Sequence, residues 1–84
     1  MTKKNFLLFM RQNNINERYY SLDGKIKDDA FHLRRNGIKW EVFYSERGKE
    51  FDNRTFNNIE DAFGYLYSVF YDAISKYGDR AFPS

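Results

Sequence analysis

The sequence is short of the residues that most often carry covalent or metal chemistry. Its 84 residues include no cysteine, which excludes disulfides and thiolate metal sites and suits a reducing compartment. It has one histidine and one proline, and Pro83 lies in the tail. No apolar run approaches the roughly 20 residues of a membrane-spanning helix, and the first residues match a signal peptide poorly. We therefore expect a cytoplasmic protein without membrane association.

The net charge of +2 is too small to indicate nucleic-acid binding, but it is unevenly spread. Residues 1–27 carry six Lys or Arg against two acids, whereas residues 50–84 carry three against six. Such asymmetry can steer a charged partner, although it says nothing about the fold.

Aromatic side chains are abundant: nine Phe, seven Tyr and one Trp. Each large aromatic side chain can bury about 150–250 Å². A chain this short buries only about 60 % of the surface that its unfolded form exposes, so these rings have to supply a dense core. The length predicts a single domain, at residues 1–78, followed by a frayed tail at residues 79–84.

The clearest structural signal is a β-hairpin at Asn36-Gly37, because this pair tolerates the positive φ angles of a type I′ turn. A two-residue loop there would set Arg35 opposite Ile38, Leu33 opposite Trp40 and Phe31 opposite Val42. Alternation predicts a core face made of Phe31, Leu33, Ile38, Trp40, Val42 and Tyr44. It predicts a mostly solvated outer face made of His32, Arg34, Lys39, Glu41 and Phe43.

Helix signals flank this hairpin. Thr2 can cap a helix that ends near Asn13-Asn14, and its apolar side holds Phe6, Leu7, Phe9 and Met10. Asn57 or Asn58 can cap a second helix that Gly78 stops. The apolar stripe of this second helix consists of Ile59, Ala62, Phe63, Leu66, Val69, Phe70, Ala73, Ile74 and Tyr77.

The remaining segments complete an α+β fold. Residues 19–22 are typical of a short strand, and we expect residues 25–28 to form a loop. Gly48 permits a reversal, and residues 51–56 can return as a further antiparallel strand. The predicted order is helix, short strand, β-hairpin, strand, helix. This order favours an antiparallel three- to four-stranded sheet with both helices on one face.

No catalytic or metal-binding pattern is present, so we expect neither an enzyme nor a cofactor. His32 has no nucleophile or orienting group beside it and is expected to pair with Glu41 across the hairpin. Asp23, Asp28 and Asp29 do not have the spacing of a calcium loop. Basic residues near the turn can contact phosphates, but charged hairpin tips also prevent edge pairing. These basic residues are Lys25, Lys27, Arg34, Arg35 and Lys39.

Acidic and aromatic residues of the second half form the candidate partner-binding site. The acidic candidates are Glu46, Glu50, Asp52, Glu60 and Asp61, expected to cluster around the last strand and the start of the second helix. The aromatic candidates outside the core are Phe43, Tyr65 and Tyr71. Acids beside exposed aromatic rings suit a basic protein partner. A plain solvated rim with tyrosines at the core edge is the alternative.

Part of the chain resembles a known family. The residues are W-E-V-F-Y-S-E-R-G at 40–48, then Phe56, then I-E-D-A-F-G-Y-L at 59–66, with Y-S-L-D-G at 20–24 before them. Over roughly residues 19–70 the chain is similar to small α+β immunity proteins of bacterial polymorphic toxin and contact-dependent inhibition systems. The resemblance implies a protein that neutralises a cognate toxin, often a nuclease, by covering its active site or an exosite. It implies no individual site residue.

Two other functions remain open. A double-stranded-RNA-binding module has the same order of elements, but such modules generally place Lys at the start of the second helix. This chain has Glu60 and Asp61 there, and these would repel phosphate. A small enzyme such as an RNase is disfavoured by the single histidine. A homodimer joined through the outer sheet face at Phe43 is compatible with all three functions.

Overall fold

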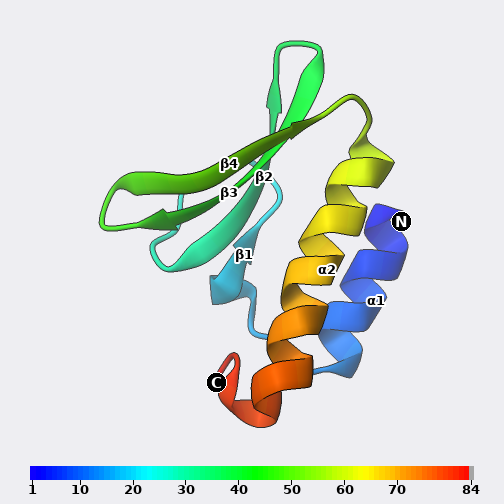
Figure 1. Cartoon of the computed structure of the whole chain (residues 1–84), viewed down its shortest axis with the longest axis vertical. Helices are drawn as coiled ribbons and strands as arrows, with labels where there is room; N and C mark the ends of the chain where they lie inside the picture. The colour runs from blue at the N-terminus through cyan, green and yellow to red at the C-terminus, as the bar shows by residue number, and fades with distance from the viewer. Residues whose placement is uncertain (84) are drawn as a thin grey trace.

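A computed structural model describes residues 1–83, and it shows a sheet with two helices packed on one face (Figure 1). The elements are α1 (Lys3–Gln12), η1 (Glu17–Tyr19), β1 (Tyr20–Ser21), β2 (Ala30–Asn36), β3 (Lys39–Glu46), β4 (Lys49–Phe56), α2 (Ile59–Tyr77) and η2 (Gly78–Arg80). The strand order is β1-β2-β3-β4. The predicted α+β class and order of elements are confirmed. The sheet differs in being mixed, because β1 runs parallel to β2.

Both helices begin and end where their capping residues predict. The Asn5 N–H donates to the Thr2 hydroxyl at 3.1 Å, and the Asp61 N–H donates to the Asn58 side chain at 2.8 Å. Asn13 caps the end of α1. Gly78 ends α2 with a φ of 57°, which favours glycine. Tyr77 was wrongly assigned to the apolar stripe, since it is largely exposed beside this end.

The core lies between the helices and the sheet. Its buried side chains include Phe6 and Met10 of α1, Leu33 and Val42 of the sheet, and Ala62, Phe63, Leu66 and Phe70 of α2. Phe70 is fully buried, and its ring lies 4.7–6.3 Å from the rings of Phe6, Tyr20, Phe31 and Phe82. Trp40 packs half-buried against this core, on the predicted inner face.

The β2–β3 turn lies one residue later than predicted. Arg35 pairs with Trp40, Leu33 with Val42 and Phe31 with Tyr44, so the predicted pairs were wrong. Gly37 has a φ of 65° and Asn36 is not among the positive-φ residues. This pattern fits a type II′ turn at Gly37-Ile38, which needs one positive φ instead of two. Ile38 is therefore 85 % exposed instead of in the core.

The outer face of the sheet is also different, because its centre is buried. Phe43 is 1 % exposed, His32 2 % and Glu41 6 %. A tight hairpin cannot join two parallel strands, so a longer loop connects β1 to β2. This loop passes over the outer face. The backbone N–H of Lys27 in this loop donates to His32 Nε2 at 2.9 Å. Residues 25–28 form no strand, as predicted.

The end of the chain, up to Pro83, the last residue described, contacts η1 and α2. The Phe82 ring lies 4.7 Å from the Phe70 ring and 5.2 Å from the Tyr19 ring. The Pro83 carbonyl accepts hydrogen bonds from Arg18 and from the Tyr19 hydroxyl. Ser84, also in the predicted tail, lies outside the described residues. Within residues 1–83, neither helix has the length and hydrophobicity needed to cross a bilayer.

Candidate partner-binding surface

The register of the sheet aligns one aromatic residue from each strand. Tyr20 pairs with Phe31, Phe31 with Tyr44, and Tyr44 with Phe51. Side chains of paired residues point to the same face. The Phe31 ring lies 5.5 Å from the Phe70 ring of α2, so this aromatic row lies on the helix-covered face.

The aromatic row, Tyr20-Phe31-Tyr44-Phe51, passes from covered to exposed along its length. Tyr20 and Phe31 contact Phe70. Tyr44 is half-buried, with its ring 4.9 Å from the Phe31 ring, whereas Phe51 is 43 % exposed. Figure 1 shows the reason: the end of the β3–β4 hairpin extends away from α2. The Tyr44-Phe51 end is therefore accessible apolar surface.

Carboxylates border this exposed end. Burial, and after it the negative charges of Asp29 and Glu46, raise the pKa of the Tyr44 phenol above its ordinary value of 10.0. The surface combines two aromatic rings and two carboxylates, and Lys49 lies opposite Glu46 at its edge. This combination is suited to binding a protein.

The outer face carries a closed polar cluster. Arg34 donates to Glu41 at 2.8 Å and binds both carboxylate oxygens of Glu50 at 2.8 and 2.9 Å. Asn53 donates to Glu41 and to Glu50, each at 2.9 Å. The Arg34 guanidinium also lies 4.2 Å from the centre of the Phe43 ring. Among the described residues, no buried side-chain polar atom lacks a partner, and this cluster links β2, β3 and β4 through Arg34, Glu41 and Glu50.

His32 is held in the same layer by backbone groups. Its Nε2 accepts from Lys27, so the proton is on Nδ1, which lies 3.1 Å from the Ala30 carbonyl oxygen. The ring stacks on Phe43 at 4.8 Å and 7°. Burial lowers the pKa of His32 below 6.5. The predicted His32–Glu41 pair is wrong, because His32 lies opposite Phe43 and Glu41 lies opposite Arg34.

The predicted acidic candidates fall into two separate groups. Glu46, Glu50 and Asp52 lie at or near the β3–β4 turn. Glu60 and Asp61 lie in the first turn of α2, beyond the other end of an eight-residue strand that spans about 26 Å. The expected single cluster is therefore wrong. Of these candidates Glu46 lies beside the aromatic row, whereas Glu50 binds Arg34 on the outer face.

The predicted aromatic candidates also separate. Phe43 is on the outer face as predicted but is buried, so it offers no exposed ring. Tyr65 is half-buried, with its ring 5.5 Å from the Phe56 ring and beneath the Arg54 guanidinium. Tyr71 is exposed on α2, next to Tyr67. None of the three belongs to the aromatic row.

Tyr44, Phe51 and Asp29 were missed as site residues. The one-residue error at the β2–β3 turn concealed the pairing of Phe31 with Tyr44. The pairing of Tyr44 with Phe51 depends on the β3–β4 turn instead, and no strand register identifies Asp29. Within residues 1–83, no three His, Cys, Asp or Glu side chains are grouped so that they could hold a metal ion.

Comparisons of this chain with protein-family models, with curated proteins and with solved structures gave no match.

Proposed function

We propose that this chain is an immunity protein, which binds a cognate bacterial toxin and neutralises it by covering its active site or an exosite. The observation that carries the proposal is the exposed Tyr44-Phe51 end of the aromatic row beside Asp29 and Glu46. Aromatic anchors ringed by charge are typical of tight protein interfaces. The sequence resemblance over residues 19–70 favours the same function.

The charge of this surface suits a nuclease as the toxin. Nucleases bind phosphates, so their substrate sites are commonly basic. Carboxylates around an apolar anchor complement such a site and accelerate association. The proposal implies that the chain acts in the cytoplasm of the toxin-producing cell.

Glu60 and Asp61 are less suited to bind the partner, because they already stabilise the N-terminus of α2. Asp61 exchanges hydrogen bonds with Asn58 at 2.8 and 3.1 Å, and both carboxylates complement the positive end of the helix dipole. The same two charges disfavour the alternative of a double-stranded-RNA-binding module, although the helix-sheet-helix order is compatible with it.

Co-expression tests the proposal. The protein encoded directly upstream of this chain's gene is expressed from an inducible promoter, with and without this chain. We expect growth arrest without the chain, restored growth with it, and a stable complex of the two purified proteins. A harmless upstream product, or arrest that the chain does not relieve, would contradict the proposal.

A further inference from the structure

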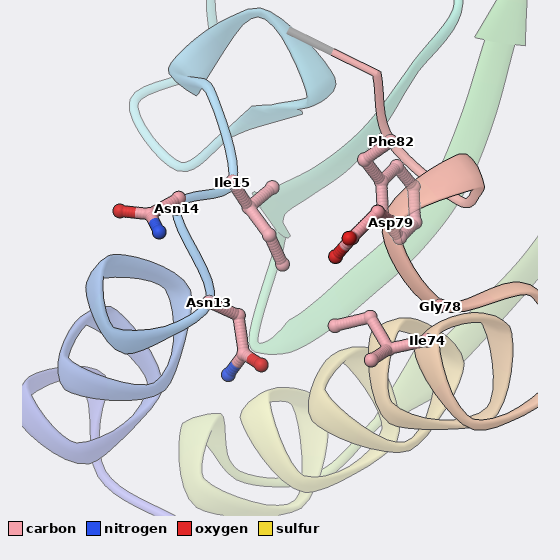
Figure 2. A pocket seen from close by; sticks show the side chains of 7 residues that line it. All are labelled: Asn13, Asn14, Ile15, Ile74, Gly78, Asp79 and Phe82. Atoms are coloured by element: carbon pink, nitrogen blue, oxygen red, sulfur yellow. The ribbon is translucent and has the colours of Figure 1, made fainter.

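A second concave site lies where the two helices end. A cavity of about 220 Å³ is lined by Asn13, Asn14, Ile15, Ile74, Gly78, Asp79 and Phe82 (Figure 2). It is smaller than the roughly 300–1,000 Å³ of pockets for drug-sized ligands. Its size therefore suits one side chain or one small organic ion.

The lining of this cavity is mixed: the apolar side chains of Ile15, Ile74 and Phe82 lie beside the polar side chains of Asn13, Asn14 and Asp79. Figure 2 shows Ile15, Ile74 and Phe82 around the cavity and the Asp79 carboxylate directed between them. The Asn13 side-chain nitrogen donates to the Phe9 carbonyl at 2.8 Å. The Asn13 amide oxygen is therefore turned toward the cavity, as Figure 2 also shows.

The electrostatics of the cavity favour a cation. It lies at the C-terminal ends of α1 and α2, where helix dipoles place partial negative charge. Within residues 1–83 both ion pairs involve Arg34, so no Lys or Arg side chain there forms an ion pair with Asp79. A calcium or magnesium ion needs about six oxygen ligands, more than one carboxylate and one amide oxygen supply.

We propose that this cavity binds a primary alkylammonium group. The ammonium donates to the Asp79 carboxylate and the Asn13 amide oxygen, and the alkyl stem packs against Ile15, Ile74 and Phe82. A compact ammonium on a flexible apolar stem matches this combination. The group comes either from a lysine side chain of a partner protein or from a small free amine. This inference does not depend on toxin binding.

NMR titration of the ¹⁵N-labelled chain with n-butylammonium chloride tests the proposal. n-Butanol is the neutral control, and the ionic strength is held constant. We expect shifts at the backbone amides of Asn14, Ile15 and Asp79, with a Kd of about 1–10 mM for so small a ligand. n-Butanol should bind at least about tenfold more weakly, since it lacks the charge. Equal Kd values for n-butylammonium and n-butanol would overturn the proposal.

The matched variants are Asp79→Asn and Asp28→Asn, which each remove one exposed carboxylate. Asp79→Asn should raise the Kd for n-butylammonium about tenfold, and Asp28→Asn should leave it unchanged. An unaltered Kd in Asp79→Asn would overturn the site. Nα-acetyl-lysine N-methylamide separates the two sources of the amine. If this lysine derivative binds more tightly than n-butylammonium, the natural ligand is a lysine side chain of a partner protein. If it binds more weakly, the natural ligand is a small free amine.

Discussion

Phe43 and His32 are buried on a sheet face that carries no helix. Lys27 of the β1–β2 loop covers His32, and the Arg34 guanidinium covers the Phe43 ring. An ion pair with Glu50 holds Arg34 in this position. A ring in such a position contributes to stability as a core residue does, because removing it leaves a cavity.

Phe43→Ala should therefore lower the free energy of unfolding by about 3–5 kcal/mol. Ile38→Ala is the matched control, because Ile38 is 85 % exposed in the turn, and it should change stability by no more than about 0.5 kcal/mol. Urea denaturation measures both values. If the two variants proved equally stable, the outer face would not be the buried layer described above.

The pH dependence of stability should report on His32. Its pKa is lowered in the folded chain, mainly by burial and further by Lys27 and Arg34, while Glu50 and the Ala30 carbonyl oppose this shift. As the pH falls through 6.5, His32 therefore becomes protonated in the unfolded chain before it does so in the folded chain. Stability should be constant above about pH 7.5 and fall as the pH drops through 6.5.

Urea denaturation at pH 7.5, 6.5 and 5.5 checks this expectation, with His32→Asn as the variant that cannot titrate. The lowered pKa of Glu50 stabilises the folded chain above pH 4.5, and this contribution is lost only below that pH, outside the measured range. The wild-type chain should lose stability between pH 7.5 and 5.5, and His32→Asn should lose less over the same range. Identical pH profiles would rule out His32 as the titrating group.

Among the elements, the β2–β3 hairpin determines where the aromatic row forms. Moving the turn by one residue shifts every cross-strand partner by two, so the residues keep their faces but change their neighbours. The face assignments for Leu33, Trp40 and Val42 could therefore be predicted from the sequence. The partners could not, because Asn36-Gly37 and Gly37-Ile38 both allow a tight turn, and the pairing of Arg34 with Glu41 favours the second.

Two matched substitutions distinguish these turns. Gly37→Thr should lower the free energy of unfolding by about 1–2 kcal/mol, because Gly37 has a φ of 65° that a β-branched residue adopts only with strain. Asn36→Thr should be nearly neutral, because Asn36 is an exposed strand residue. Thermal denaturation measures both. A comparable loss in Asn36→Thr would instead indicate a turn at Asn36-Gly37.

At the scale of the whole molecule, local signals predicted the order of elements and both helix caps. Thr2, Asn58 and Gly78 act on their own neighbours in sequence, so their effects can be read without knowing the fold. Parallel pairing of β1, the loop over His32 and the packing of Phe82 are contacts between distant segments. No local pattern encodes them, and together they determine which aromatic rings remain exposed.

The central claim is that the exposed end of the aromatic row binds the partner. Isothermal titration calorimetry of the upstream gene product with Phe51→Ala tests it most directly, with Ile38→Ala as the exposed control. We expect Phe51→Ala to raise the Kd at least about 30-fold, as loss of an anchoring ring costs about 2 kcal/mol or more, and Ile38→Ala to leave it unchanged. A Kd that Phe51→Ala does not alter would contradict the account.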